Sequence, residues 1–397
     1  MAESRFYPYF VFAICFMGVA LGAMNSVLAP SYLPDILKEL NHVALSPENA
    51  GAWINFSFLA GGTIGGICLG FISDRIGRKK TLVLALLFCG AGSGLGALCT
   101  SWMLFAASRC IVGIGVGAIL VVSVVILTEI WAKKANGVAL GIMSVAYPVG
   151  IITSGLITAN ISDWKTAFMI GLFPIALIIP VVFLVKETLI PRLQVQSSNF
   201  SLAGYQHSLI SGILIYGTML IGLWSAFAWL PTWVEKLMGN SSTDSQPQRG
   251  MAVTLLGLGG LTGGIISGWL ADKFGSRIIQ GICFILCLAL SFLLFKMTKS
   301  YSDIVLIGSG LLGFVFGVSQ GVLNILIPGL FPVQLRSSAT GLCFHVGRAF
   351  TAIAVFFTGA LAIWLGGYGN AIFIFSGVYV IGLLALVFMK KEGNAAH

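Results

Sequence analysis

The chain alternates between long apolar runs and short polar connections. Runs of membrane-spanning length recur twelve times, and each could cross the roughly 30 Å hydrocarbon core of a bilayer as a helix. We place these spans at residues 6–28, 52–72, 81–99, 102–128, 137–159, 166–185, 209–233, 252–271, 278–297, 304–330, 339–365 and 371–389. The pattern predicts an all-α membrane protein with twelve transmembrane helices.

Composition excludes a soluble globular protein. Hydrophobic residues make up 57% of the 397 positions, charged residues make up 9%, and the mean hydropathy is +0.98. A net charge of +9 would point to nucleic acid in a soluble chain, but here the basic residues lie in short loops beside apolar runs. We therefore expect the lipid bilayer, and no nucleic acid, as a partner.

The distribution of basic residues predicts the orientation in the membrane. Twelve spans put both ends of the chain on one face, and fourteen of the 22 lysines and arginines belong to that face. Six belong to the opposite face, and Arg109 and Arg348 lie inside spans. By the positive-inside rule we expect both termini in the cytoplasm. We expect a multi-pass protein of the bacterial cytoplasmic (inner) membrane that functions as a monomer.

The chain divides into two similar halves. The longest interior polar connection covers residues 186–207, which predicts a bundle at 1–185, a cytoplasmic linker at 186–207 and a second bundle at 208–397. Residues of the first half recur 198 to 200 positions later. The pairs are Gly70/Gly268, Asp74/Asp272, Gly77/Gly275, Gly113/Gly313, Gly117/Gly317 and Gly141/Gly341.

A short basic connection at residues 70–80 is the most specific motif. It reads GFISDRIGRKK, with Gly70, Asp74, Arg75, Gly77, Arg78 and Lys79 at its defining positions. This spacing resembles the signature loop of the major facilitator superfamily of transporters. The resemblance implies two six-helix bundles that rock about a central site, with ion pairs of this loop locking the cytoplasmic side.

The same resemblance implies which residues take part in gating. These are Asp74, Arg75, Gly77, Arg78, Glu129, Asp272 and Arg336. Glu129 at the end of the fourth span and Arg336 at the start of the eleventh are the expected neighbours of Asp74.

Two further stretches carry arginines inside spans. Arg109 is followed by spaced glycines, as in the fourth-helix motif of the superfamily, and lies about eight residues (~12 Å) inside its span. Phe331-Pro332, Arg336, Gly341 and Gly347-Arg348 resemble the pattern of the branch that imports organic acids with protons. Arg348 is twelve residues (~18 Å) past Arg336 and therefore near the middle of the membrane.

The charges at depth predict an anionic substrate. Arg109 and Arg348 lie well inside spans, one in each half, whereas no aspartate or glutamate lies at similar depth. A guanidinium in the membrane interior should face a cavity or a partner, and it binds carboxylates in a bidentate manner. Each arginine could instead bind groups of the protein itself, such as the backbone carbonyls of its own half.

The remaining candidate residues follow from depth and chemistry. For substrate binding we select Arg109, Arg348, Asn25, Tyr147, Trp224, Gln320 and Asn324, and for proton coupling His345 and Glu129. We predict a secondary active transporter of a small organic anion with proton coupling. The alternatives are export of hydrophobic drugs or import of a zwitterion such as an amino acid. No nucleotide loop or cluster of His, Cys and carboxylates points to an enzyme, a metal or a cofactor.

Overall fold

The computed structural model describes residues 6–41, 45–131, 136–187, 202–239, 244–332 and 335–389. Within these ranges the protein is helical, and twelve candidate spans are long and apolar enough to cross a membrane. The predicted class, an all-α protein with twelve transmembrane helices, is confirmed. Most of the predicted linker 186–207 and the basic pairs Lys133-Lys134 and Lys390-Lys391 lie outside the described residues.

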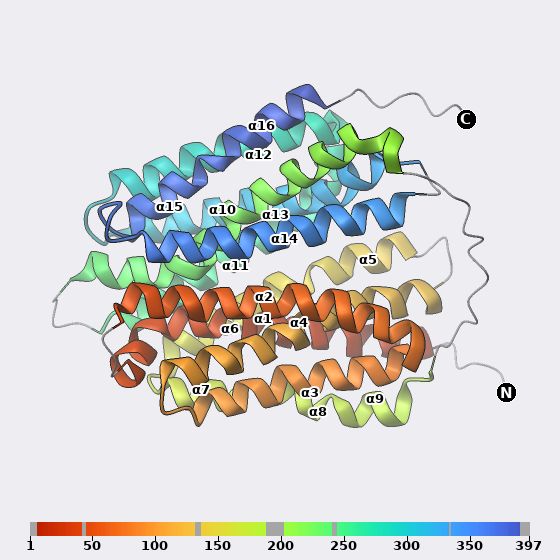
Figure 1. Cartoon of the computed structure of the whole chain (residues 1–397), viewed down its shortest axis with the longest axis horizontal. Coiled ribbons are helices and arrows are strands. Elements are labelled where there is room, and N and C mark those ends of the chain that lie inside the picture. The colour runs from red at the N-terminus through yellow and green to blue at the C-terminus, as the bar shows by residue number, and fades with distance from the viewer. Residues whose placement is uncertain are drawn as a thin grey trace.

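Helices α1 to α9 form the half of the molecule drawn in red to yellow-green (Figure 1). Their bounds are α1 Tyr7–Leu40, α2 Pro47–Ile76, α3 Arg78–Ala97, α4 Trp102–Ile130, α5 Asn136–Ser144, α6 Ala146–Asn160, α7 Trp164–Ile170, α8 Phe173–Ala176 and α9 Ile178–Leu184.

The green-to-blue half contains the remaining elements (Figure 1). Their bounds are η1 Leu202–Tyr205, α10 Gln206–Met238, α11 Gln246–Phe274, α12 Ser276–Ser291, η2 Phe292–Met297, α13 Asp303–Gly329, α14 Arg336–Ala360, α15 Tyr368–Ser376 and α16 Val378–Phe388. We call the side at which α1 begins and α16 ends the terminal face, and the other side the opposite face.

Two spans are divided into shorter helices by prolines. Each break between α5 and α6, α7 and α8, and α8 and α9 lies within one turn before Pro148, Pro174 or Pro180. A proline ring clashes with the carbonyl four residues earlier and leaves it without its helical donor, so the helix breaks or kinks there.

The first span is longer than the predicted 6–28. Helix α1 continues through Pro30 and Pro34 to Leu40. A proline signals a helix end in water, but inside a protein in a membrane the neighbouring helices can stabilise the interrupted turns. Residues Met24 to Pro34 of α1 are all buried, so α1 is held on every side at this point.

The internal repeat is visible as repeated helix contacts. Glycines of α2 and α4 lie directly against backbone carbonyls of the partner helix, and the same is true of α11 and α13. The contacts are Gly61 with Cys110, Gly65 with Ile114, Gly113 with Phe58 and Gly117 with Gly62, matched by Gly259 with Gly310, Gly263 with Phe314, Gly313 with Leu256 and Gly317 with Gly260. Corresponding residues are 198 or 200 positions apart, so the repeat predicted from the sequence also describes how the helices pack.

Adjacent glycines of α11 allow a direct test of this packing. A Cβ atom on Gly263 would collide with the Phe314 carbonyl group of α13, whereas a Cβ atom on Gly264 would meet nothing within 4 Å. We expect Gly263→Ala to lower the free energy of unfolding by about 1–3 kcal/mol. Gly264→Ala, as the matched control, should leave the thermal stability in detergent unchanged. Equal stability of the two variants would contradict close packing of α11 on α13.

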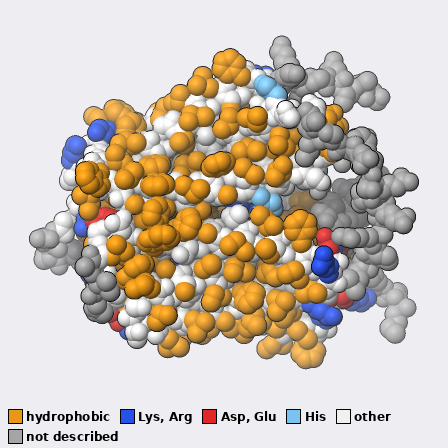
Figure 2. Space-filling view, viewed as in Figure 1, with side chains coloured by type: hydrophobic (Ala, Val, Ile, Leu, Met, Phe, Trp, Pro, Cys, Tyr) orange, Lys and Arg blue, Asp and Glu red, His pale blue; other side chains and the backbone are white. Residues whose placement is uncertain are grey.

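The surface fits a protein that lies across a membrane. Hydrophobic side chains cover the face seen in Figure 2, while acidic and basic side chains gather mainly toward its two ends. Large exposed apolar residues include Phe71, Phe183, Trp364 and Phe388. Such a continuous apolar surface is stable only in lipid.

Candidate functional site

A cavity of about 330 Å³ lies between the two halves. Both halves line it: Phe58, Val116 and Tyr147 come from the first, and Trp224, Gln320 and Arg348 from the second. Five of the seven predicted substrate residues line this cavity, namely Tyr147, Trp224, Gln320, Asn324 and Arg348. The position between two bundles is where carriers with internal repeats hold their substrate.

Arg348 is the only arginine or lysine among the described residues that line the cavity, and no aspartate or glutamate lines it. The described part of the chain contains no hydrogen-bond or ion-pair partner for its guanidinium. Gln320 also lines the cavity, and its side-chain Nε2 is buried without a partner. Arg348 therefore gives the cavity a cationic donor, which suits an acceptor such as a carboxylate.

The rest of the cavity wall is largely aromatic. Tyr216 and Phe344 stack with ring centroids 4.3 Å apart, and Phe58 and Trp224 lie 5.9 Å apart. Phe227 and Phe316 also line the space. Flat apolar walls with a few donors favour a small, partly apolar ligand.

Arg109 does not line this cavity. It is fully buried beside a separate pocket of about 10 Å³, room for roughly one water molecule. Its Nη2 donates to the Asn25 carbonyl at 2.5 Å, and its guanidinium lies over the rings of Phe58 and Phe168. Nε and Nη1 are buried without a partner. The sequence left open that Arg109 binds carbonyls of its own half. One of its three guanidinium nitrogens does so, and the other two do not.

Asn25 lines neither pocket. Its amide nitrogen donates to the carbonyls of Leu21 and Gly171, which turns the side chain toward the short helices of its own half. In this conformation the structure does not bring Asn25 together with the five cavity residues.

His345 lies one turn before Arg348 on α14 and approaches the other half. A Cβ atom on Gly66 of α2 would be 3.6 Å from its Cε1 atom, and its Nδ1 is buried without a partner. The other proton-coupling candidate, Glu129, accepts from Arg78 Nε at 3.0 Å, whereas its second oxygen is buried without a partner. These two candidates lie in different environments, and neither lines the cavity.

Four of the five predicted gating residues of the first half, all except Arg75, lie together on the terminal face. Arg78 pairs with Asp74 at 2.8 Å and with Glu129 at 3.0 Å, and also donates to the Ser73 carbonyl. Glu129 is thus joined to Asp74 through Arg78. Gly77, at φ +105°, forms the whole connection between α2 and α3.

The other predicted gating residues are not part of this cluster. Arg336 donates to the Phe331 carbonyl of its own half. Arg75 and Asp272 are exposed, and neither forms an ion pair with a described residue. Among the described residues, no ion pair joins the two halves on the terminal face.

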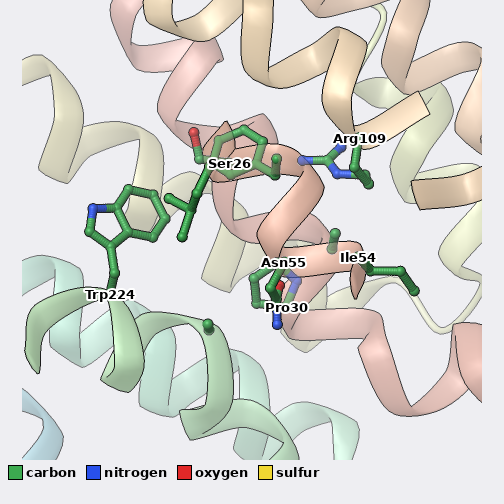
Figure 3. Close-up of a pocket in the computed structure, with 10 residues that line it drawn as sticks. Ser26, Pro30, Ile54, Asn55, Arg109 and Trp224 are labelled. Carbon is green, nitrogen blue, oxygen red and sulfur yellow. The ribbon is translucent and has the colours of Figure 1, made fainter. Parts of the chain in front are cut away.

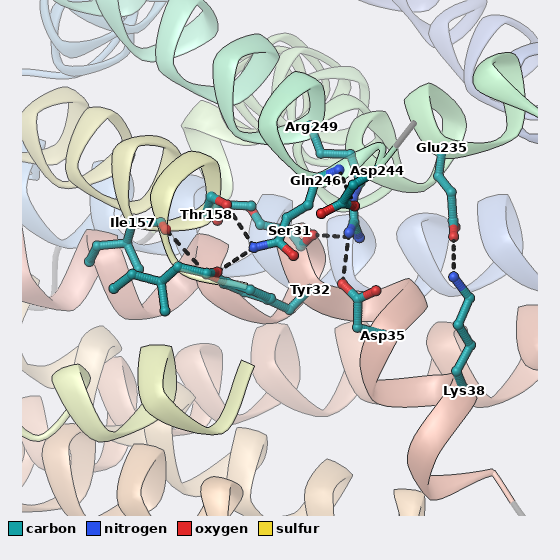
Figure 4. Close-up of polar contacts among 11 residues, drawn as sticks. Ser31, Tyr32, Asp35, Lys38, Ile157, Thr158, Glu235, Asp244, Gln246 and Arg249 are labelled. Carbon is teal, nitrogen blue, oxygen red and sulfur yellow. Dashed lines mark hydrogen bonds and ion pairs between the residues drawn. The ribbon is translucent and has the colours of Figure 1, made fainter. Parts of the chain in front are cut away.

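The two halves are instead joined at the opposite face (Figure 4). Arg249 of α11 donates to the Asp35 carboxylate at 2.8 Å and to the Ser31 carbonyl at 3.2 Å, and only 1% of its side chain is exposed. Gln246 donates to the Thr158 carbonyl at 2.9 Å and also to that of Ile161. We call Asp35, Gln246 and Arg249 with their carbonyl partners the opposite-face cluster.

Packing agrees with these polar contacts. Between α6 and α11, Gly155 and Gly250 lie against the partner backbone near the opposite face. Further toward the terminal face, a Cβ atom on Gly264 or Gly268 would meet nothing within 4 Å. The halves are thus closely packed between α6 and α11 on the opposite side of the cavity, whereas this part of α11 is less closely covered toward the terminal face.

Twelve candidate spans in two repeated halves with an interior cavity between them are typical of a membrane transporter. Comparisons with known proteins identify the family to which this transporter belongs. The model of the Major Facilitator Superfamily matches residues 12–342 and 237–396, and the chain belongs to this family. It is a family of transporters, not enzymes.

Curated relatives include carriers of organic acids. The chain is 26% identical to the cis,cis-muconate transport protein of Acinetobacter baylyi, over 96% of this chain and 94% of the relative. It is 28% identical to a sialic acid transporter of Escherichia coli, over 83% and 82%. Among solved structures, the D-xylose-proton symporter superimposes with a TM-score of 0.80 at 17% identity, covering 97% of this chain and 98% of the symporter; this similarity shows the fold.

Proposed function

We propose that the protein is a secondary active transporter of a small organic anion, a carboxylate, which it moves by alternating access together with protons. The observation that carries the proposal is the guanidinium of Arg348, which faces a cavity between the halves and has no partner among the described residues. An unpaired cation in the membrane interior costs roughly 2.5–3.5 kcal/mol, and an anionic ligand offsets that cost.

Three further observations support a carboxylate. The aromatic walls suit an organic rather than an inorganic anion. A zwitterion or a cation would need a carboxylate for its ammonium group, and none of the described cavity residues supplies one. The names of several relatives also specify acids, including gentisate and 4-hydroxybenzoate.

The different states of the two faces support alternating access. The halves are held together at the opposite face and have no ion pair between them on the described terminal face. We infer that the cavity is reached from the terminal face in this conformation. The cluster of Asp74, Arg78 and Glu129 would meet the second half when that face closes, and we assign it, with Arg75, Gly77, Asp272 and Arg336, to gating.

For proton coupling we propose His345. Its imidazole lies between α14 and α2, where the halves meet, and its Nδ1 has no partner that would fix one protonation state. Glu129 is bound to Arg78, which supports a role in gating. The protein would act in the cytoplasmic membrane with both termini in the cytoplasm, as a monomer.

Uptake into proteoliposomes tests this function. With an acidic exterior, we expect a radiolabelled carboxylate such as 4-hydroxybenzoate to accumulate above its external concentration. A protonophore should abolish accumulation because the proton gradient supplies the energy. His345→Gln should lose accumulation but keep exchange between internal and external substrate. Accumulation that persists without a proton gradient would contradict proton coupling, and transport of amines in preference to acids would contradict the anion site.

A further inference from the structure

The pocket beside Arg109 is the feature that the proposed site leaves unexplained. Arg109 is fully buried, and two of its three guanidinium nitrogens have no partner. Leaving buried donors of a charged group unpaired costs free energy that a structural role alone would not require. Asn55, which also lines this pocket, likewise has an unpartnered side-chain nitrogen.

The pocket and the main cavity are separated by a single layer of side chains. Phe58, Leu59 and Trp224 line both spaces. In Figure 3, Trp224 extends from α10 of the second half, while Arg109 lies on the far side of the pocket in the first half. Phe58 and Trp224 belong to different halves and contact each other, so a change in how the halves meet would part them.

The second observation concerns the positive charges deep inside the spans, which lack acidic partners in the described part of the chain. The spans contribute two guanidinium groups at depth, one from each half, and neither has an acidic partner among the described residues. A ligand with one negative charge would neutralise Arg348 and leave Arg109 unpaired. A ligand with two acidic groups would neutralise both and would contact both halves.

We propose that the transported anion is a dicarboxylate, with one carboxylate held by Arg348 and the other by Arg109 after the Phe58–Trp224 pair has moved aside. This inference rests on the proposed function, since it requires Arg348 to bind a carboxylate. It adds that Arg109 determines specificity for a second acidic group. It also links ligand binding to conformational change. A molecule that contacts both guanidinium groups must reach past Phe58 and Trp224, which belong to different halves and have to part.

The test compares diacids with monoacids of equal chain length. Isothermal titration measures how tightly the purified protein binds two series of acids. The diacids run in chain length from succinate through suberate, and the monoacids from butanoate through octanoate. A largely apolar cavity with a single arginine would favour the monoacids, because a second carboxylate would lose its hydration without a partner. We expect the reverse, with the diacid of the best-fitting length binding about tenfold more tightly than its monoacid.

Variants separate this inference from the function on which it rests. Arg109→Gln should bring the Kd of the best diacid to that of its monoacid, whereas Arg348→Gln should weaken both. Monoacids that bind at least as tightly as diacids at every length would overturn the dicarboxylate and leave a monocarboxylate carrier. Failure of every acid to bind would overturn both. The chain-length comparison uses the unmodified protein, so it remains decisive if Arg109→Gln does not fold.

Discussion

Arg348→Gln is expected to abolish transport without destabilising the protein. The guanidinium faces the cavity and has no hydrogen-bond or ion-pair partner among the described residues, so the substitution removes a ligand contact but breaks no such bond within them. A hydrogen bond to a charged group contributes roughly 1.5–3 kcal/mol. Its loss should raise the Kd for a carboxylate by about 10- to 100-fold.

Arg348→Gln should leave the thermal stability of the protein unchanged or raise it. Removing an unpaired cation from the membrane interior relieves a cost, so the Tm of Arg348→Gln in detergent should equal or exceed that of the parent protein. Arg348→Lys should be intermediate in affinity, because an ammonium keeps the charge but lacks the planar fork.

Arg277→Gln is the matched control. Arg277 lies at the start of α12 and donates to the Val387 carbonyl, away from the cavity. It should bind and transport normally. The measurements are uptake into proteoliposomes and titration with a carboxylate for all three variants. Normal uptake by Arg348→Gln would show that this arginine does not hold the substrate.

The sequence predicted the fold because the relevant signals are local. A membrane-spanning helix is recognised from its own residues, and the glycine repeats at offsets of 198 and 200 are present as contacts between α2 and α4 and between α11 and α13. The end of the first span was wrong because Pro30 indicates a helix end only where nothing else stabilises the chain. That stabilisation comes from neighbouring helices, which local patterns do not describe.

The cavity was predicted in part. Depth along a helix identified Tyr147, Trp224, Gln320, Asn324 and Arg348. It could not tell that Asn25 turns toward Gly171, or that Phe58 and Trp224 separate Arg109 from the cavity. Depth gives the level of a residue in the membrane but not the direction of its side chain. The direction depends on how helix rotations fit together across the whole bundle.

Sequence reasoning missed the opposite-face cluster altogether. Asp35 and Arg249 are 214 residues apart, and neither was among the predicted site residues. One signal was present: Arg249 falls in the first turn of a helix, where the macrodipole disfavours a cation. A basic residue in that position suggests an anionic partner, but the identity of that partner depends on how the two halves dock.

The ion pair between Asp35 and Arg249 is expected to control which face of the protein is open. Asp35→Asn leaves a buried guanidinium without its anion, and it does so only while the halves are joined at the opposite face. Breaking a fully buried pair costs 3–5 kcal/mol. Asp35 is 27% exposed, so we expect about 2 kcal/mol here, a shift of roughly 30-fold toward the conformation open at the opposite face.

Spin labels on the two sides of the opposite face can measure this shift. Ser162 of the first half and Lys236 of the second are exposed, and each can be replaced by a labelled cysteine in a background without the native cysteines. Asp35→Asn and Arg249→Gln should both move the distribution of distances between the labels to longer values. The exchanged pair Asp35→Arg with Arg249→Asp should restore part of the shorter population.

Lys38→Gln provides the control for this experiment. Lys38 also joins the halves, through Glu235 at 2.8 Å, but 71% of its side chain is exposed. An exposed ion pair contributes only about 0–1 kcal/mol, so the distribution should change little. If Lys38→Gln and Asp35→Asn had equal effects, burial of Arg249 would not be what holds the opposite face closed. If neither had any effect, the backbone packing of α6 on α11 would be sufficient to keep it closed.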